Sequence, residues 1–201
     1  MASPKVLLFD LGGVLVDACG LRELPQLLAQ PMPPADLRHK WVSSPAVERF
    51  ETGRCSTDEF AATFTEEWGL RLQRVDFIAR FQSWVGAPYP GTAELLSALR
   101  SRYTLACLSN TNAAHWEKLR QMDGLRLVLE RPFVSHQLGA MKPSQEIYDH
   151  VVRALGCEPS EIAFFDDGPE NIDGAARAGL SSHQTVGPDH LRHVLGELGL
   201  L

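Results

Sequence analysis

Hydrophobic and polar positions along the chain fall into three blocks. A short apolar run, Lys5–Phe9, ends abruptly at Asp10 and predicts a strand that is buried on both faces. From about Asp17 to Pro88 the apolar positions take the spacing of amphipathic helices. From Tyr89 onward, strand-like and helix-like segments alternate. We therefore expect one early strand, then a helical block, then a region of alternating strands and helices.

The middle block carries its aromatic residues at helical spacing. Half of the aromatic residues of the chain lie between residues 17 and 88, and many of them recur about every four residues. Helix packing explains such stripes better than ligand binding does, so this block should have a small core of its own. The stripes are Phe60, Phe64 and Trp68, then Phe77, Phe81 and Trp84, and a loop is marked by Pro31, Pro33 and Pro34.

The last block alternates apolar runs with segments that open on helix-starting residues. Pro90–Thr92 and Pro169 are typical of helix N-termini, and Ser144 is a candidate N-cap. The expected strands are 103–108, 133–135, 162–165 and 183–186, and the expected helices include one over 112–122 and one at the C-terminus.

This alternation predicts an α/β fold, a Rossmann-like parallel sheet with helices on both faces and an inserted helical cap. Residues 1–16 and 89–201 should form the core, and residues 17–88 the cap. In such sheets the ligand site lies beyond the carboxyl ends of the strands. The residues that directly follow each strand are therefore the ones to examine.

Composition narrows the possible partners. The 201 residues are 44% hydrophobic and carry a net charge of −6, which disfavours binding to nucleic acid or to an anionic membrane. No apolar run approaches the roughly 18 residues of a membrane span, and no apolar signal-peptide core precedes Asp10. The four cysteines are scattered, which favours reduced thiols and a cytoplasmic location. The oligomeric state cannot be inferred from the sequence.

Polar residues gather where the predicted strands end. Asp10 follows the first strand, Ser109–Asn110 the second and Asp166–Asp167 the fourth, while Lys142 lies in the loop after the third. Clustered carboxylates repel one another unless a cation lies between them, and hard oxygen ligands select Mg²⁺ over zinc. An aspartate can also act as a nucleophile and form an aspartyl phosphate. The set is therefore suited to phosphoryl transfer.

These stretches resemble, in order and spacing, the four motifs of the haloacid dehalogenase-like (HAD) superfamily. The resemblance covers almost the whole chain, and the insertion at residues 17–88 matches the helical cap of the C1 type. Leu108–Asn112 and Phe164–Asp167 are similar to the bacterial sugar-1-phosphate phosphatase branch, which includes alpha-D-glucose-1-phosphate phosphatase.

The resemblance implies a metal site. Asp10 would be the nucleophile and a Mg²⁺ ligand, Gly12 would offer its backbone carbonyl, and Asp167 would be the second carboxylate ligand. Asp166 would bind through a water or lie outside the ligand set. Asn171 would orient a water or Asp167.

The resemblance also implies a phosphate site. Ser109 would bind the phosphate, with Asn110 beside it. Lys142 would pair with both the phosphate and the nucleophile. The substrate would be a small-molecule phosphate ester.

The chain departs from the family at Gly12. Most HAD phosphatases have an aspartate there as general acid and base, although the sugar-1-phosphatase branch shares the glycine. Gly12 can instead relieve crowding in a tight turn. Asp17 could replace the missing acid or bind a sugar hydroxyl, or it could be a solvent-facing hinge residue. His115 could also approach the substrate.

We expect a Mg²⁺-dependent phosphatase that hydrolyses a small phosphate monoester, with a sugar 1-phosphate as the best single candidate, through an aspartyl phosphate. A cap of about 70 residues would exclude macromolecular substrates. One alternative is a Mg²⁺-independent 2-haloacid dehalogenase, although those enzymes typically lack the Asp166–Asp167 pair. Another is a catalytically weak protein that binds a phosphate ligand.

Overall fold

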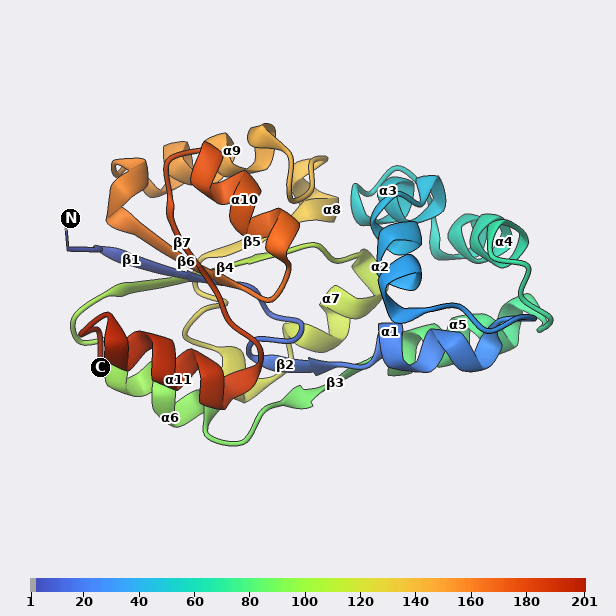
Figure 1. Ribbon diagram of the computed structural model, residues 1–201, viewed down its shortest axis with the longest axis horizontal. Helices are drawn as coiled ribbons and strands as arrows, with labels where there is room; N and C mark the ends of the chain where they lie inside the picture. The colour runs from blue at the N-terminus through green and yellow to red at the C-terminus, as the bar shows by residue number, and fades with distance from the viewer. Residues whose placement is uncertain (1–2) are drawn as a thin grey trace.

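The computed structural model describes residues 3–201, and a five-stranded parallel sheet forms its centre (Figure 1). The strand order is β5-β4-β1-β6-β7, so the first strand lies in the middle of the sheet. The strands are β1 (Val6–Phe9), β4 (Thr104–Ser109), β5 (Pro132–Val134), β6 (Ile162–Asp166) and β7 (Ser181–Gln184).

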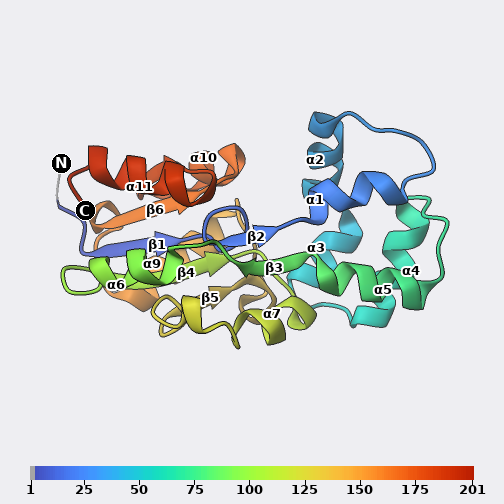
Figure 2. The same cartoon turned by 90° about the horizontal axis from the view of Figure 1, so that it is seen from below.

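Helices cover both faces of this sheet (Figures 1 and 2). Leu7 and Phe9 of β1 pack on one helical layer, and Val6 and Leu8 pack on the other, as strand alternation requires. The first layer consists of α6 (Thr92–Leu99), α7 (Ala113–Leu119) and α11 (Gly187–Glu197), and the second of α8 (Ser135–Leu138), α9 (Gln145–Leu155) and α10 (Pro169–Arg177). Two 3₁₀ turns, η2 (Asp123–Leu125) and η3 (Pro159–Glu161), lie in the connections. The expected α/β fold class is confirmed.

The chain leaves the sheet after β1 and forms a helical segment before it returns. A two-stranded antiparallel ribbon, β2 (Val16–Ala18) and β3 (Val85–Pro88), carries the chain out and back. A cluster of buried, mostly aromatic side chains holds the helices together, with Phe64 and Phe77 stacked at 5.1 Å between ring centroids. The helices are α1 (Gly20–Glu23), η1 (Leu24–Leu27), α2 (Pro34–Val42), α3 (Pro45–Glu51), α4 (Thr57–Glu67) and α5 (Arg74–Ser83).

Several element boundaries differ from the sequence-based expectations. The last strand lies two residues earlier, at Ser181–Gln184 instead of 183–186, and α7 is shorter than 112–122. Ser144 occupies the N-cap position of α9, but its side chain makes no capping hydrogen bond. Residues 85–88 lie in the block whose pattern predicts helices, but Val85–Pro88 form strand β3, which the sequence did not indicate because Gly and Pro are poor strand signals.

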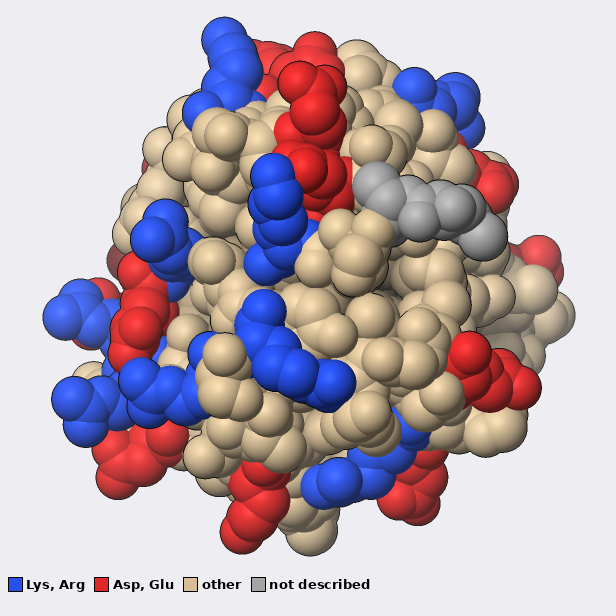
Figure 3. All heavy atoms as spheres, turned by 90° about the vertical axis from the view of Figure 1, so that its left-hand side faces the viewer, with Lys and Arg blue, Asp and Glu red and all other residues tan. Residues whose placement is uncertain are grey.

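The surface away from the helical segment carries both signs of charge. Figure 3 shows this end of the molecule, with Lys and Arg side chains interspersed with Asp and Glu side chains. Among residues 3–201, no helix combines the length and apolar character that a membrane crossing needs.

Candidate active site

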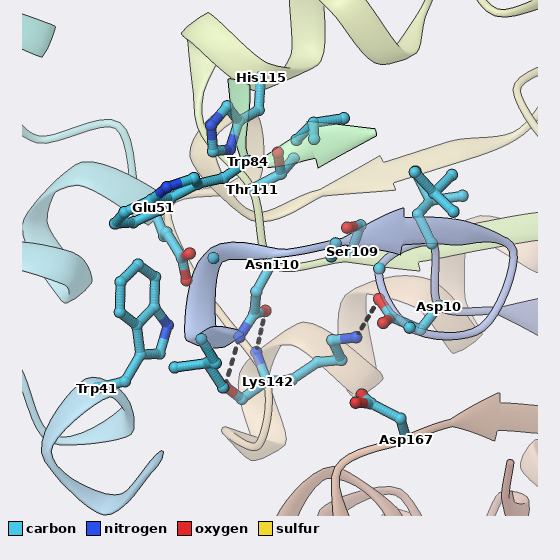
Figure 4. A pocket seen from close by; sticks show the side chains of 18 of the residues that line it. Asp10, Trp41, Glu51, Trp84, Ser109, Asn110, Thr111, His115, Lys142 and Asp167 are labelled. Carbon is cyan, nitrogen blue, oxygen red and sulfur yellow. Dashed lines mark hydrogen bonds and ion pairs between the residues drawn. The ribbon is translucent and has the colours of Figure 1, made fainter. Parts of the chain in front are cut away.

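The polar residues at the strand ends converge at one edge of the sheet, on the floor of a cavity of about 260 Å³. Phe9 pairs with Cys107 of β4 and with Phe165 of β6, so Asp10 follows β1 level with the ends of both neighbours. Helices α2 and α3 of the inserted segment supply the opposite wall (Figure 4). The cavity is of a size that suits a small molecule.

Lys142 is the centre of the floor. Its side chain is only 1% exposed, and its ammonium donates to Asp10 Oδ1 at 2.7 Å, Asp166 Oδ2 at 2.6 Å and the Leu108 carbonyl at 3.0 Å. Burial lowers the pKa of Lys142, but the Asp10 and Asp166 carboxylates outweigh burial and raise the pKa above its ordinary value. All three ammonium protons are used, so the lysine is a fixed positive charge.

The side-chain oxygens of Asp166 and Asp167 differ in how many hydrogen bonds they accept. Asp166 is completely buried, and its second oxygen accepts from Gly168 N at 2.7 Å and Asn171 Nδ2 at 2.9 Å. Asp167 is partly exposed, and its nearest cationic atom is Arg38 Nη1 at 4.0 Å. Burial and the nearby Asp166 raise the pKa of Asp167. Asp167 therefore has oxygen atoms free to bind a ligand, whereas those of Asp166 are already occupied.

The carboxylates fit a hard cation. Ligand atoms of Asp10, Asp166 and Asp167 lie within 4.8 Å of one another. Burial raises the pKa of Asp10 to about 7; Lys142 opposes this shift, and the two other aspartates add to it. One lysine does not balance three acids, and a divalent cation among these oxygens would favour their charged forms. The donor set suits Mg²⁺.

Ser109 and Asn110, predicted to bind phosphate, both line the cavity. Ser109 ends β4 and is buried beside the floor. The Asn110 side chain accepts from Lys142 N at 2.8 Å and donates to the Lys142 carbonyl at 2.9 Å (Figure 4). Asn110 thus holds the loop that presents Lys142, and this role was not expected from the sequence.

Two glycines shape the turn after β1. Gly13 has φ +78°, and a Cβ there would lie 2.9 Å from Asp167 Oδ2. Gly12 lines the cavity, and a Cβ there would lie 3.1 Å from the Ala18 methyl carbon. The close approach of Ala18 supports the interpretation that glycine relieves crowding at position 12.

The structure argues against the predicted contact between Asp17 and substrate. Val16 and Ala18 line the cavity, and alternation along β2 turns the intervening Asp17 away from it. The Asp17 carboxylate instead forms an exposed ion pair with Arg22 at 2.6 Å.

His115 lines the cavity, but both ring nitrogens are engaged. Nε2 lies 2.7 Å from the Phe81 carbonyl, and Nδ1 lies 3.2 Å from Asn112 Nδ2. Burial lowers the pKa of His115 to about 4, so the ring is neutral near pH 7. His115 links α7 to the end of α5 and has no free nitrogen for proton transfer.

Sequence reasoning missed the residues that the inserted segment contributes. Arg38 of α2 pairs with Glu170 of α10 at 2.8 Å and so joins the two walls of the cavity. Glu51 is buried on the same α3 face as Val47 and Phe50. The available signal was an acidic residue at a position where the helical spacing predicts an apolar one. The sequence alone could not show that this position faces a cavity.

The chain is similar to known proteins over most of its length. Residues 4–179 match the model of the haloacid dehalogenase-like hydrolase family. The chain is 29% identical to the D-ribitol-5-phosphate phosphatase of Bacteroides thetaiotaomicron over 192 residues, which cover 90% of this chain and 91% of that protein.

Solved structures of HAD enzymes share the fold. One is a HAD family enzyme of Bacteroides thetaiotaomicron in complex with magnesium and inorganic phosphate, with TM-score 0.69 and 25% identity over 91% of this chain and 94% of that one. Another is an L-2-haloacid dehalogenase, with TM-score 0.63 and 26% identity over 92% of this chain and 85% of that one.

Proposed function

The chain belongs to the haloacid dehalogenase-like hydrolase family, and we propose that it is a Mg²⁺-dependent phosphatase of small phosphate monoesters, with a sugar 1-phosphate as substrate. The observation that carries the proposal is the Lys142 ammonium, bonded to both Asp10 and Asp166 beside the free Asp167 carboxylate. The named relatives include phosphatases of small esters, and one HAD structure holds magnesium and phosphate. The unpaired cysteines fit a cytoplasmic setting.

Asp10 and Asp167 would hold the metal, together with the Gly12 carbonyl. When bound, Mg²⁺ supplies positive charge that offsets the charge of the phosphoryl group during transfer. Asp166 belongs outside the ligand set, because Lys142, Gly168 and Asn171 already occupy its oxygens.

The reaction has two steps. A carboxylate oxygen of Asp10 attacks phosphorus, the bond from phosphorus to the ester oxygen breaks, and the departing alcohol oxygen takes a proton from water. A water molecule then attacks the phosphorus of the aspartyl phosphate and loses a proton to solvent, while the bond from phosphorus to the Asp10 carboxylate oxygen breaks. Inorganic phosphate leaves, and the Asp10 carboxylate is restored. Lys142 favours the ionised form of Asp10 and orients it, and Ser109 donates its hydroxyl to a phosphoryl oxygen. Residues 17–88 act as the cap and keep bulk water from the site.

A substrate panel tests the proposal. Purified protein is assayed for phosphate release from p-nitrophenyl phosphate and a set of sugar phosphates, with Mg²⁺ and with EDTA, and for chloride release from 2-chloropropionate. We expect Mg²⁺-dependent phosphate release and no chloride. Chloride release without Mg²⁺ would identify a dehalogenase instead, and tight ester binding without turnover would identify a binding protein.

A further inference from the structure

Glu51 is a buried acid without a partner in the wall opposite Asp10. It ends α3, lines the cavity and is 8% exposed. Within residues 3–201, nothing donates a hydrogen bond to its carboxylate or forms an ion pair with it. Figure 4 shows the carboxylate projecting into the cavity, on the far side of Asn110 from Asp10.

This placement is unfavourable for folding. Burial raises the pKa of Glu51 to about 7, and the C-terminal end of a helix disfavours a carboxylate as well. Val47 and Phe50 lie on the same helix face and pack in the aromatic core. An apolar residue at position 51 would therefore cost less folding free energy than an acid does. A carboxyl group at such a position, open to the cavity, can complete its hydrogen bonds with a ligand that enters there.

Two indole rings line the same part of the cavity as the carboxylate. Trp41 and Trp84 have ring centroids 6.2 Å apart, and both line the cavity (Figure 4). Flat apolar surfaces beside a single acid suit a group that presents C–H bonds to the rings and hydroxyls to the acid. A plain hydrocarbon chain would leave the acid unpaired.

The position also selects which part of the substrate Glu51 meets. With the phosphoryl group between Asp10 and Ser109, the alcohol part of the ester extends toward the wall made by α2 and α3. We propose that Glu51 is a specificity-determining residue that binds hydroxyl groups of a polyol or sugar leaving group beside the Trp41 and Trp84 rings. This inference rests on the proposed phosphatase function.

Hydroxyls fit the carboxyl group better than an ammonium group does. Burial is the main influence on the pKa of Glu51, and the charges of Lys142 and Asp10 shift that pKa in opposite directions. Burial favours the protonated form of the Glu51 carboxyl group. A hydroxyl can donate to the ionised form or accept from the protonated form, whereas an ammonium needs the ionised form.

The test pairs Glu51→Gln with substrates that lack single hydroxyls. The hydroxylated ester that the wild type turns over best is compared with its monodeoxy analogues and with p-nitrophenyl phosphate. We expect Glu51→Gln to lower kcat/KM for the full ester by about 10- to 100-fold, the scale of a hydrogen bond to a charged group. For one deoxy analogue the loss should shrink to less than about threefold, because the hydroxyl that Glu51 binds is then absent.

Binding gives a second measurement. In an Asp10→Asn background, titration calorimetry with the same ester should show a similar loss of affinity from Glu51→Gln, and a much smaller loss for inorganic phosphate. Glu48→Gln is the matched control, because Glu48 is exposed on the same helix and faces Arg54 at 3.6 Å. Glu48→Gln should keep the wild-type ratio of kcat/KM for the full ester to kcat/KM for the deoxy analogues.

Three results would overturn the inference. Equal losses on the full ester, every deoxy analogue and p-nitrophenyl phosphate would indicate a general catalytic or structural role. A preference for an amino-alcohol phosphate that Glu51→Gln abolishes would indicate ammonium binding. A wild type that prefers p-nitrophenyl phosphate to every hydroxylated ester would exclude the sugar subsite and leave the phosphatase function standing. Failure to hydrolyse any ester with Mg²⁺ would instead refute the proposed function itself.

Discussion

At the scale of single residues, the site is organised around one buried cation. The Lys142 ammonium donates hydrogen bonds to both Asp10 and Asp166, and Asn110 holds the lysine's own backbone. Removing one member of a buried ion pair leaves an uncompensated charge, so conservative substitutions are needed to separate chemistry from folding.

The first prediction concerns Asp10. Asp10→Asn should lower kcat by more than about a thousandfold, because an amide cannot act as the anionic nucleophile. The fold should survive, since Lys142 keeps Asp166 and the Leu108 carbonyl as partners. Single-turnover phosphate release measures the loss of activity, and circular dichroism checks that the fold is retained. Retention of more than a tenth of the activity would reject Asp10 as the nucleophile.

The second prediction separates the paired aspartates. Asp167→Asn should raise the Mg²⁺ concentration for half-maximal activity at least about tenfold more than Asp166→Asn does, because only Asp167 has free oxygens. Asp166→Asn should mainly lower the free energy of unfolding, by about 1–3 kcal/mol, since it disturbs a buried hydrogen-bonded acid. Mg²⁺ titrations and urea melts measure the two effects. If both variants shift the Mg²⁺ requirement alike, the assignment of Asp167 as the direct ligand is wrong.

At the scale of elements, the turn between β1 and β2 connects the floor of the site to the inserted segment. Gly13 N donates to the Val16 carbonyl, and the Gly13 carbonyl accepts from Gly187 N at 2.7 Å. The turn is thereby bound to the start of α11 as well as to β2. Its backbone geometry requires a residue without a side chain beside Asp167.

The third prediction tests this turn. Gly13→Ala and Gly69→Ala both place a methyl group at positive φ and should each cost about 1–2 kcal/mol of stability. Only Gly13→Ala should also weaken Mg²⁺ activation, because its Cβ would press on Asp167, whereas a Cβ added at Gly69 would meet nothing of residues 3–201 within 4 Å beyond its own chain neighbours. Thermal melts and Mg²⁺ titrations of the two variants provide the comparison. An unchanged Mg²⁺ requirement in Gly13→Ala would show that Asp167 yields to the methyl group without loss.

At the scale of the whole molecule, contacts between the inserted segment and the sheet enclose the cavity from several sides. Arg38 pairs with Glu170, His115 meets the Phe81 carbonyl, and Lys118 meets the Val85 carbonyl. None of these contacts supplies the acid and base that Gly12 lacks. Asp17 faces outward, and His115 has both nitrogens occupied.

The fourth prediction follows from this missing base. Activation of the hydrolytic water should be slow, since general acid–base help is worth about 10² to 10⁴ in rate. Rapid mixing with p-nitrophenyl phosphate should therefore release a burst of about one nitrophenol per site, followed by a slower steady state. Steady rates should vary little among activated esters. A linear time course whose rate tracks leaving-group acidity would show that phosphorylation limits turnover.

Much of the fold and of the site floor was predictable from the sequence. Apolar runs of strand length and helix-starting prolines are local signals, and the carboxyl ends of parallel strands meet at one edge of a sheet. Asp10, Ser109, Lys142 and Asp167 were therefore placed together before any distance was known, and the α/β fold and the family are confirmed.

The tertiary structure decided what depends on how the inserted segment meets the sheet. Whether Asp17 faces inward or outward depends on the register of a three-residue strand, and a shift of one residue reverses it. Glu51 precedes Lys142 by 91 residues and Arg38 precedes Glu170 by 132 residues, yet all four side chains line one cavity. Local spacing determines which elements form, because it reflects hydrogen bonding and burial within a few residues. The opposing wall of the cavity is set by packing between distant elements, and no local pattern encodes that packing.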